Sequence, residues 1–599
     1  MKKMWLFLFI LLVLTASALA QTQKQYTLKL LAVQENSNGT LSGSGADLYL
    51  ELKEGSGRVF LDTYPVPKMD TQISTRFAKE IACEQYDLPC HKYDFIYTIK
   101  AESNIIGGPS AGAAIAALTT IAMMDLPYNQ ETAITGTINS GGVIGPVGGT
   151  KEKIEAASRL GLKTVLIAKG TAPQSLPKEN NTNITEEYLN LTKYAAENLS
   201  TTVVEVSDLD EVIFHLTGKN LNHKITEIKE DEEYTAIMSD LRDLLCNRAD
   251  KAEVELKKEG ISLNESILET VRQQKGKSDN ATLEEDYYSA ASYCFTASIM
   301  LRSVYYQEKE PVLSVVWDRF LLLEKEVANL EQELSEQKIE TISDLQTLII
   351  VKERLNDVKE QIAKFKEVQD EKGEDFYGLL SYAEERYFSA RAWMQFFSME
   401  GKQLVFDKEH LQQSCQQKIF EAEERQQYVA LFIGEVNTLE ISKKIVAAKE
   451  AAGKNELELC LMKAIQAKGD ANAVLSAIGL RPESLHEAVE SKSIAVKKVI
   501  AENSADGKFP ILGYSYYQYA KSLQEQQPFT TLIYLEYALE MSDLSIYFPE
   551  EKTFLETFPE RFPLDKKWLE GFALGVILTI LLLQIKPKRI KKYLKRLMK

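Results

Sequence analysis

The sequence lacks the short motifs by which metal and nucleotide sites are usually recognised. It contains no C-x-x-C and no H-E-x-x-H, and its five histidines are scattered along the chain. No G-x-x-x-x-G-K-[ST] phosphate loop occurs either, and the nearest candidate, GPVGGTKEK at 145–153, has the wrong spacing. We therefore expect no metal, no cofactor and no bound nucleotide.

A net positive charge is also lacking, because the formal net charge is −17. A chain this acidic is not expected to bind nucleic acid. Cysteine is scarce but even in number, which permits disulfides outside the cytoplasm. Cys83 and Cys90 could close a short loop or remain free buried thiols, and the other cysteines are Cys246, Cys294, Cys415 and Cys460.

Apolar runs mark both ends of the chain. Residues 1–20, MKKMWLFLFILLVLTASALA, combine two lysines, an apolar run and a small-x-small site, which predicts a signal peptide with Gln21 as the first mature residue. A first transmembrane anchor is the alternative, but it would need a longer run. Residues 568–585 are long and apolar enough to span a bilayer, and the basic tail at 586–599 indicates a cytoplasmic C-terminus. We expect a single-pass protein of the cell membrane with its body outside.

Sites for N-glycosylation fit such an exported chain. Seven N-x-S/T sequons occur, at Asn38, Asn180, Asn183, Asn190, Asn198, Asn264 and Asn280. Four of them fall between residues 180 and 200, which predicts a surface loop there.

The first two hundred residues alternate between strand and helix patterns. β-Branched and aromatic content predicts strands over 26–33, 46–55, 57–66 and 94–102, and buried strands over 163–168 and 201–206. Helices are predicted over 71–86, over 110–124 and from about Thr150. We assign an α+β or α/β domain to residues 25–218.

The rest of the chain has a helical composition. After about Asn220 glycine and proline become rare, which predicts a linker over 219–235 and a helical domain over 236–560. Apolar spacings of three and four over 318–365 predict two long helices, which could form an antiparallel coiled-coil hairpin. The residues in this stripe are Phe320, Leu323, Val327, Leu330 and Leu334, followed by Leu345, Leu348, Leu355, Val358 and Ile362.

One serine stands where a glycine turn meets an apolar helix, in GGPSAGAAIAALTT at 107–120. Ser110 could cap this helix, or it could be a nucleophile beside backbone N–H groups that stabilise an oxyanion. The second reading requires a base. Lys153 lies in the first turn of the helix that Thr150 is predicted to cap, where the helix dipole and burial both disfavour an ammonium. A lysine kept partly neutral there is a credible general base.

These two motifs resemble the proteolytic domain of Lon proteases. In that family the serine of GPSAG is the nucleophile and the second lysine of GG-x-K-x-K is the base, 43 residues later. The resemblance implies that Ser110 and Lys153, rather than Lys151, form a catalytic dyad. It also places Thr135 beside the lysine, with Gly108 and Ala111 as supporting residues. The similarity extends over about residues 25–218.

The chain departs from the family at several positions. Gly107 replaces a usual acidic residue, Thr137 a common glutamate and Gly141 a common arginine. These changes concern substrate positioning and activation. The ATP-driven unfolding module of Lon proteases has no counterpart in this sequence.

The resemblance implies an ATP-independent, membrane-anchored serine endopeptidase that cleaves unfolded or exposed polypeptides outside the cytoplasm. It also implies a homo-oligomer, since Lon-like domains commonly form hexameric rings. The sequons and the membrane anchor are similar to those of uncharacterised archaeal Lon-like proteins. Two alternatives stay open: a catalytically idle domain in a surface scaffold or binding protein, and a domain that cuts its own chain once.

Overall fold

The computed structural model describes residues 24–35, 41–64, 66–101, 109–169, 171, 174–175, 188–221, 227–309, 312–368, 375–403, 408–478, 480, 484–505, 507–542 and 544. The predicted signal peptide, membrane span and basic tail lie outside these residues, as do Gly107 and Gly108. Among the helices that are described, none is long and apolar enough to cross a bilayer. Below, residues 24–221 are called the N-terminal domain and residues 227–544 the helical region.

A four-stranded sheet forms one layer of the N-terminal domain. Its order is β1-β2-β4-β3, with antiparallel β1–β2 and β2–β4 pairs and a parallel β3–β4 pair. Alternating apolar residues bury one face, on which Leu48, Leu50 and Tyr97 are fully covered. The strands are β1 Gln25–Glu35, β2 Leu41–Glu54, β3 Val59–Tyr64 and β4 Tyr93–Ala101.

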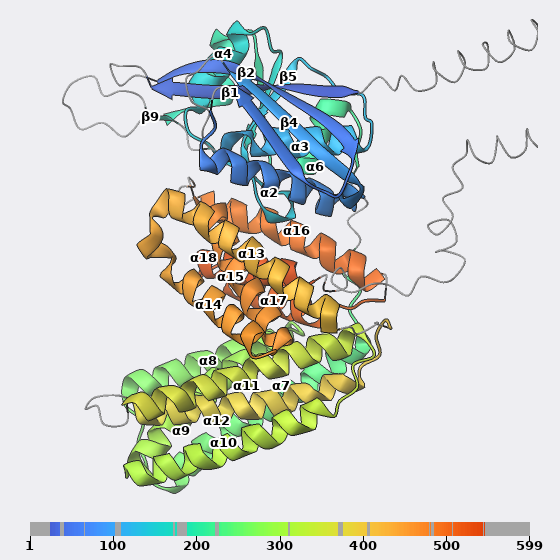
Figure 1. Ribbon diagram of the computed structural model, residues 1–599. Coiled ribbons are helices and arrows are strands. Elements are labelled where there is room, and N and C mark those ends of the chain that lie inside the picture. Colours follow the sequence, from blue (N-terminus) through green and yellow to red (C-terminus); the bar gives the residue numbers. More distant parts are fainter. Residues whose placement is uncertain are drawn as a thin grey trace, which may run out of the picture. The chain divides into compact units, whose positions relative to one another are not determined.

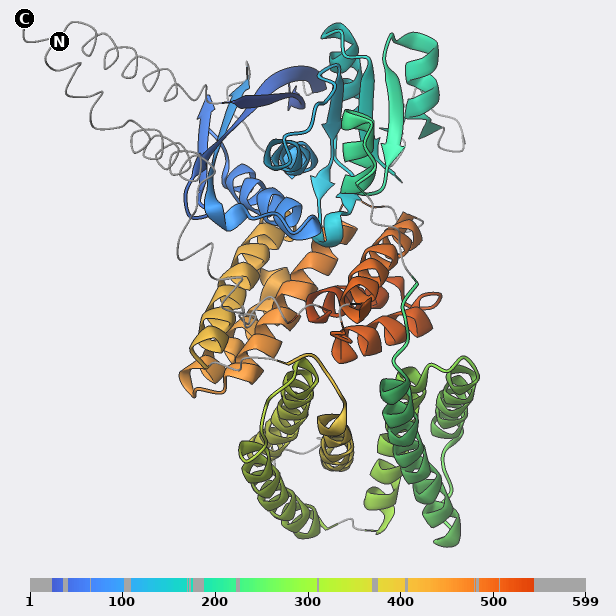
Figure 2. The ribbon, with the colours of Figure 1, turned by 90° about the vertical axis from the view of Figure 1, so that its right-hand side faces the viewer.

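A second, three-stranded sheet and a central helix complete the core. The parallel order is β11-β8-β5, with β5 Thr132–Thr135, β8 Thr164–Ala168 and β11 Thr202–Val206. Helix α3, Gly112–Met123, is rich in alanine, and its residues from Gly112 to Ala122 are buried, so it packs closely on its neighbours. Helices α2, Met69–Gln85, and α6, Leu209–Thr217, contact it (Figure 1). Figure 2 shows α3 end-on between the two sheets.

Shorter elements connect these layers. They are β6 Thr137–Ile138, β7 Ile144–Gly145, α4 Thr150–Arg159, β9 Gln174–Ser175, β10 Tyr188–Leu189 and α5 Leu191–Asn198. The surface loop expected at 180–200 is partly wrong, because α5 occupies its second half. The side chain of Asn190 caps this helix by accepting a hydrogen bond from Lys193 N. Asn190 and Asn198 are nevertheless exposed, and Asn180 and Asn183 lie outside the described residues.

The helical region begins inside the segment predicted to be a linker. Helix α7 starts at Glu232 because Asp231 caps it, accepting hydrogen bonds from Glu233 N and Tyr234 N. Helix α7 spans Glu232–Lys258. The described α-helices that follow it are α8 Glu265–Leu283, α9 Tyr287–Lys309, α10 Leu313–Ser335, α11 Ile342–Val368, α12 Phe376–Trp393, α13 Lys408–Ile433, α14 Leu439–Gly453, α15 Leu457–Ala477, α16 Leu485–Ala505, α17 Ile511–Leu523 and α18 Pro528–Met541.

The two long helices expected over 318–365 are present as α10 and α11. Every residue of the predicted apolar stripe is buried, from Phe320 to Ile362. Phe320 of α10 stacks on Phe365 of α11 with ring centroids 4.4 Å apart. The two helices contact each other and both contact α12, so the stripe serves packing within a bundle.

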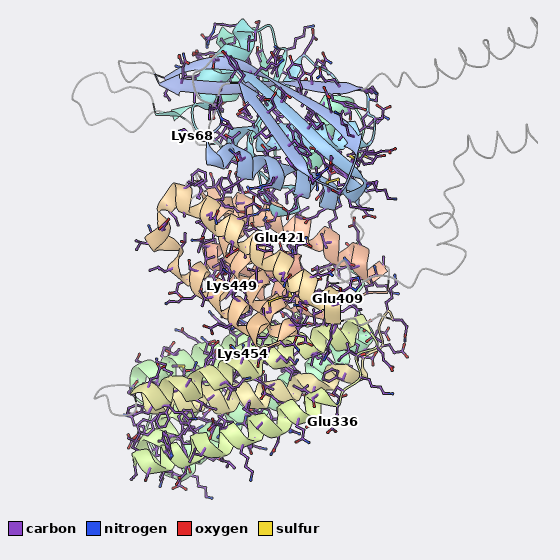
Figure 3. The ribbon with its side chains drawn as sticks, viewed as in Figure 1. Lys68, Glu336, Glu409, Glu421, Lys449 and Lys454 are labelled. Atoms are coloured by element: carbon purple, nitrogen blue, oxygen red, sulfur yellow. A yellow bond between two sulfur atoms is a disulfide. The ribbon has the colours of Figure 1, made fainter. Side chains whose placement is uncertain are left out.

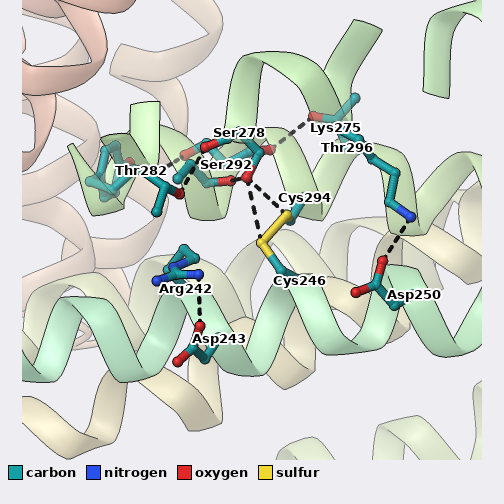
Figure 4. The surroundings of a disulfide bond; sticks show 12 residues. Arg242, Asp243, Cys246, Asp250, Lys275, Ser278, Thr282, Ser292, Cys294 and Thr296 are labelled. Carbon is teal, nitrogen blue, oxygen red and sulfur yellow. Dashed lines mark hydrogen bonds and ion pairs between the residues drawn. A yellow bond between two sulfur atoms is a disulfide. The ribbon is translucent and has the colours of Figure 1, made fainter. Parts of the chain in front are cut away.

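Three disulfides join neighbouring elements, and no described cysteine is free. Cys83 of α2 bonds to Cys90, which resolves the alternative between a short loop and free thiols. Cys246 joins α7 to α9, and the hydroxyl of Ser278 lies beside both sulfurs (Figure 4). Cys415 joins α13 to α15 by bonding to Cys460. All described residues belong to one compact unit.

Candidate functional site

Ser110 lies in a single 3-10 turn, Pro109–Ala111, that leads into α3. The α-helix begins at Gly112 with Ala111 as its N-cap, and no side chain caps it. The hydroxyl of Ser110 is therefore not used as a helix cap, which removes the alternative reading of this residue. The side chain is half-buried.

Two backbone hydrogen bonds hold this turn against the end of β5. Gly136 N donates to the carbonyl of Ser110 at 3.2 Å, and Ala113 N donates to the carbonyl of Gly136 at 3.1 Å. A side chain at position 136 would lie 2.7 Å from Ile144 Cγ2, so the close approach requires glycine. Ser110 is thus fixed beside Thr135–Gly136.

Thr135, the last residue of β5, carries a buried hydroxyl without a partner. The residue is 1 % exposed, and among the described residues nothing hydrogen-bonds to its Oγ1. An unsatisfied buried hydroxyl costs roughly 1–3 kcal/mol and calls for an explanation. A hydrogen-bond partner that reaches this Oγ1 only when the site is active would explain why the hydroxyl is kept.

The helix that carries Lys153 starts differently from the prediction. Its N-cap is Gly149, in the left-handed region at φ 64°, and Thr150 is the first helical residue. Thr150 is therefore not the cap, because its hydroxyl donates to the carbonyl of Val147 at 2.9 Å. A side chain at position 149 would lie 2.7 Å from Val33 Cγ1, so the close approach of β1 requires glycine at this N-cap.

Lys153 is buried and has no acidic partner among the described residues. The residue is 2 % exposed, and burial lowers the pKa of its ammonium to about 8. Lys151 differs sharply. Its side chain is about one-third exposed, lies 3.8 Å from Glu155 Oε1 and stacks over the ring of Tyr194. Of these two lysines, Lys153 has the environment expected of a general base.

Strand β1 connects the three residues. It contacts the 3-10 turn of Ser110, the strand of Thr135 and the helix of Lys153. The backbone bonds bring Ser110 and the end of β5 together. No hydrogen bond joins Ser110 Oγ to Lys153 Nζ among the described residues. Catalytic hydrogen bonds are often long in a ligand-free enzyme and shorten when substrate binds.

The departure at Gly141 has a structural cause. Gly141 lies in the turn Ser140–Gly142 at φ 69°, where a side chain would meet Ala495 Cβ at 2.9 Å and Leu539 Cδ2 at 3.3 Å. Helices α16 and α18 cover this turn and exclude an arginine. Thr137 pairs with Gly145 across the β6–β7 hairpin, where its hydroxyl occupies the space a side chain at 145 would need.

A polar cluster that sequence reasoning missed lies at the same turn. Lys492 Nζ of α16 donates to Ser140 Oγ at 2.8 Å and to the Ser140 carbonyl at 2.7 Å. It also pairs with Glu536 of α18 at 2.6 Å, and Ser140 Oγ donates to the same carboxylate. All three side chains are buried. Because its three members come from the N-terminal domain, α16 and α18, the cluster is suited to attachment of the helical region.

Fold and site together define an α/β domain in which a serine on a fixed turn accompanies a buried lysine of lowered pKa. Residues 85–217 match the family model for the Lon protease (S16) C-terminal proteolytic domain. The match includes Ser110, Thr135 and Lys153. It confirms the resemblance for this segment, which begins at the end of α2; strands β1 to β3 precede it.

Known Lon proteases show the same similarity. The chain is 36% identical over 122 residues to the Lon protease of Mycoplasma mobile, which covers 20% of this chain and 13% of that protein. It is 36% identical over 116 residues to the Lon protease of Rickettsia conorii, covering 19% and 13%. For Roseiflexus castenholzii the values are 42% over 79 residues, covering 13% and 10%. The chain thus spans only about an eighth of the length of these relatives.

Proposed function

We propose that the N-terminal domain is a Lon-type serine endopeptidase that cleaves unfolded or exposed polypeptides. Ser110 is the nucleophile, Lys153 the general base and Thr135 the residue that orients the lysine. The observation that carries the proposal is the buried lysine without a carboxylate, on a segment similar to Lon proteolytic domains.

The proposed reaction needs only groups of this chain and water. Neutral Lys153 Nζ accepts the proton of Ser110 Oγ as that oxygen attacks the peptide carbonyl carbon. Backbone N–H groups at the 3-10 turn, including that of Ala111, stabilise the oxyanion. The lysine ammonium then gives the proton to the leaving amine. Water, deprotonated by the same lysine, hydrolyses the acyl-enzyme and regenerates Ser110.

The buried hydroxyl of Thr135 has a role in this scheme. It accepts a hydrogen bond from the Lys153 ammonium when the proton has been transferred, and so satisfies an otherwise unpaired group. Gly108, the other supporting residue, lies outside the described part of the chain.

The experiment is cleavage of a disordered protein by the purified full-length chain and by its Ser110→Ala form. We expect the rate of cleavage to fall by about 10³-fold or more in Ser110→Ala. Ser158→Ala on α4, whose hydroxyl bonds to Ser200, is the control and should keep the rate. Equal cleavage by all three proteins would show that Ser110 is not the nucleophile. Cleavage of the chain only, once and in cis, would favour self-processing.

We further propose that the chain is anchored in the cell membrane with its body outside, and that it forms a homo-oligomer such as a hexameric ring. The membrane anchor rests on residues 568–585 and the basic tail, and the ring rests on resemblance alone. Protease added to intact cells should digest the body and leave a fragment from about Trp568 onward. A protected body would contradict the proposed topology.

A further inference from the structure

A cavity of about 590 Å³ lies apart from Ser110, between the start of β3, helix α2 and helix α13. Its volume is within the range of ligand sites, roughly 300–1,000 Å³. One wall carries the cations Arg58, Arg76 and Lys79, and the other presents side chains of α13. The cavity therefore needs an explanation of its own.

The carboxylates on the cavity wall are already paired. Glu80 lies 2.9 Å from Arg425, and Glu424 lies 2.9 Å from Arg76. Glu421, labelled on α13 in Figure 3, lies 2.6 Å from Lys418 and 2.9 Å from Lys468. The acids of the wall therefore offer little free negative charge to a ligand.

Lys79 is the exception among the charged groups of the wall. Its Nζ lies over the ring of Phe95 at 5.3 Å, and no described carboxylate comes within ion-pair distance of it. The side chain is half-buried at the cavity. Arg58 on the same wall donates from Nε and Nη2 to Asp94 Oδ2, and its side chain is 66% exposed. An acidic group in the cavity would complement both.

The remaining lining favours a polypeptide over a small anion. Exposed amides of Gln413, Gln416 and Gln417 line the α13 wall and can hydrogen-bond to a peptide backbone. Phe420 is 68% exposed beside them, which offers an apolar contact. A small anion would use neither feature.

Strand β3 adds a backbone edge. Among the described strands it is the outer one of its sheet, and its described partner is β4. Val59, its first residue, lines the cavity, and Phe60 and Tyr64 further along are exposed. An extended segment that leaves the cavity can therefore continue as an added strand beside β3.

We propose that this cavity is a docking site for an extended polypeptide segment bearing an acidic side chain. The carboxylate binds Lys79 and Arg58, the backbone binds the glutamines of α13 and the edge of β3, and an apolar side chain packs on Phe420. If the proposed peptidase activity is correct, the site holds substrate chains away from the site of cleavage. This inference rests on that activity only for its purpose; the binding itself is independent.

The test is peptide binding by the full-length Ser110→Ala protein, measured by fluorescence anisotropy. The probe is a labelled disordered peptide with glutamates, and its partner has glutamine at the same positions. We expect Lys79→Met to weaken binding of the acidic peptide by about tenfold, the effect of losing one good charge pair, with little effect on the glutamine peptide. Lys100→Met is the matched control, because Lys100 also lies over a ring, that of Tyr49, on the same sheet but away from the cavity.

A second pair of variants tests the apolar part. Phe420→Ala should also weaken binding, whereas Leu431→Ala, at an exposed position on the same helix, should not. Unchanged binding in Lys79→Met would overturn the proposal. Competition by millimolar glutarate with no effect of Phe420→Ala would also overturn it in favour of a small-anion site. Loss of cleavage in Ser110→Ala concerns the peptidase alone, so the two proposals fail separately.

Discussion

At the scale of single residues, the protonation of Lys153 controls the proposed chemistry. Burial lowers the pKa of this ammonium to about 8 from the usual lysine value of 10.5. Near neutral pH a minority of molecules carries the neutral amine that can accept a proton from Ser110. The rate of cleavage should therefore depend steeply on pH near neutrality.

We predict that the rate of cleavage of a disordered peptide rises with pH and levels off above about pH 8. The reason is that only the neutral lysine is a base, and its fraction grows through its pKa. Lys153→Ala should abolish turnover, and Lys151→Ala, which removes a partly exposed side chain, should have a mild effect. The measurement is the pH profile of kcat/KM for the three proteins. Equal losses at both lysines would contradict the assignment.

The same burial should cost stability. In the folded state the pKa is near 8 and in the unfolded state near 10.5, so between these values only the unfolded chain binds the proton. Stability contributed at this site therefore rises with pH across that window, and below pH 8 the full penalty is present.

Lys153→Met should raise the free energy of unfolding of the N-terminal domain by up to ~3 kcal/mol at pH 7, and by little above about pH 10.5. Hydrogen exchange of the peptides that cover α4 and β8 can measure this locally. Lys151→Met is the control and should change protection little at either pH. A gain that does not depend on pH would show that the penalty is not electrostatic.

At this scale the sequence predicted the burial of Lys153. The dyad of Ser110 and Lys153 follows from motif spacing and stays a prediction. The cap was predicted wrongly, because Thr150 is a good N-cap by residue type but its hydroxyl donates to the carbonyl of Val147, and Gly149 precedes the helix instead. The unpaired hydroxyl of Thr135 could not be read from sequence either, since pairing depends on neighbours distant in the chain.

At the scale of elements, α16 and α18 meet the turn Ser140–Gly142 through a buried ion pair. Lys492 and Glu536 share Ser140 between them, and none of the three side chains reaches solvent. A buried pair adds little net stability by itself, but removing one partner leaves an uncompensated charge.

We predict that Lys492→Met alone costs about 3–5 kcal/mol, measured as the free energy of urea unfolding. Adding Glu536→Gln should recover part of the lost stability, because a neutral amide then replaces the unpaired buried carboxylate. The double-mutant cycle isolates the pair from general effects of either substitution. Additive losses would contradict the coupling.

Strands of five or more residues were predictable, and shorter ones were not. Alternation over many residues gave β1, β2 and β4, and apolar spacing gave α10 and α11. Strands β5, β6 and β7 have two to four residues, too few to show a period. Lys492 and Ser140 are 352 residues apart in the sequence, so no local pattern predicts their hydrogen bond.

At the scale of the whole molecule, the question is which substrates can reach Ser110. A scissile peptide must be extended at the 3-10 turn, and a folded substrate resists this with its unfolding free energy, typically 5–15 kcal/mol. This sequence contains no phosphate loop from which ATP could supply that energy. For the proposed peptidase we therefore expect substrates that are already unfolded.

We predict that a disordered protein is cleaved at the same rate with and without ATP, and that a stable folded domain is cleaved only after destabilisation. The measurement compares a folded substrate with its destabilised point mutant, each with and without ATP. Acceleration by ATP, or equal cleavage of the folded and destabilised substrates, would contradict an ATP-independent enzyme for unfolded chains.

The covering of Gly141 by Ala495 and Leu539 limits how this protein can be divided and recombined. A fragment cut at residue 218 would uncover that turn and remove both charged partners of Ser140. Lys492 and Glu536 would keep each other, and Glu536 would also keep its hydrogen bond from Ser476. Fusing the N-terminal domain to another protein would therefore require substitutions at Ser140 and Gly141. Chimeras without such substitutions should keep α16 and α18. A unit transferred by protein engineering should therefore contain the N-terminal domain together with helices α16 and α18.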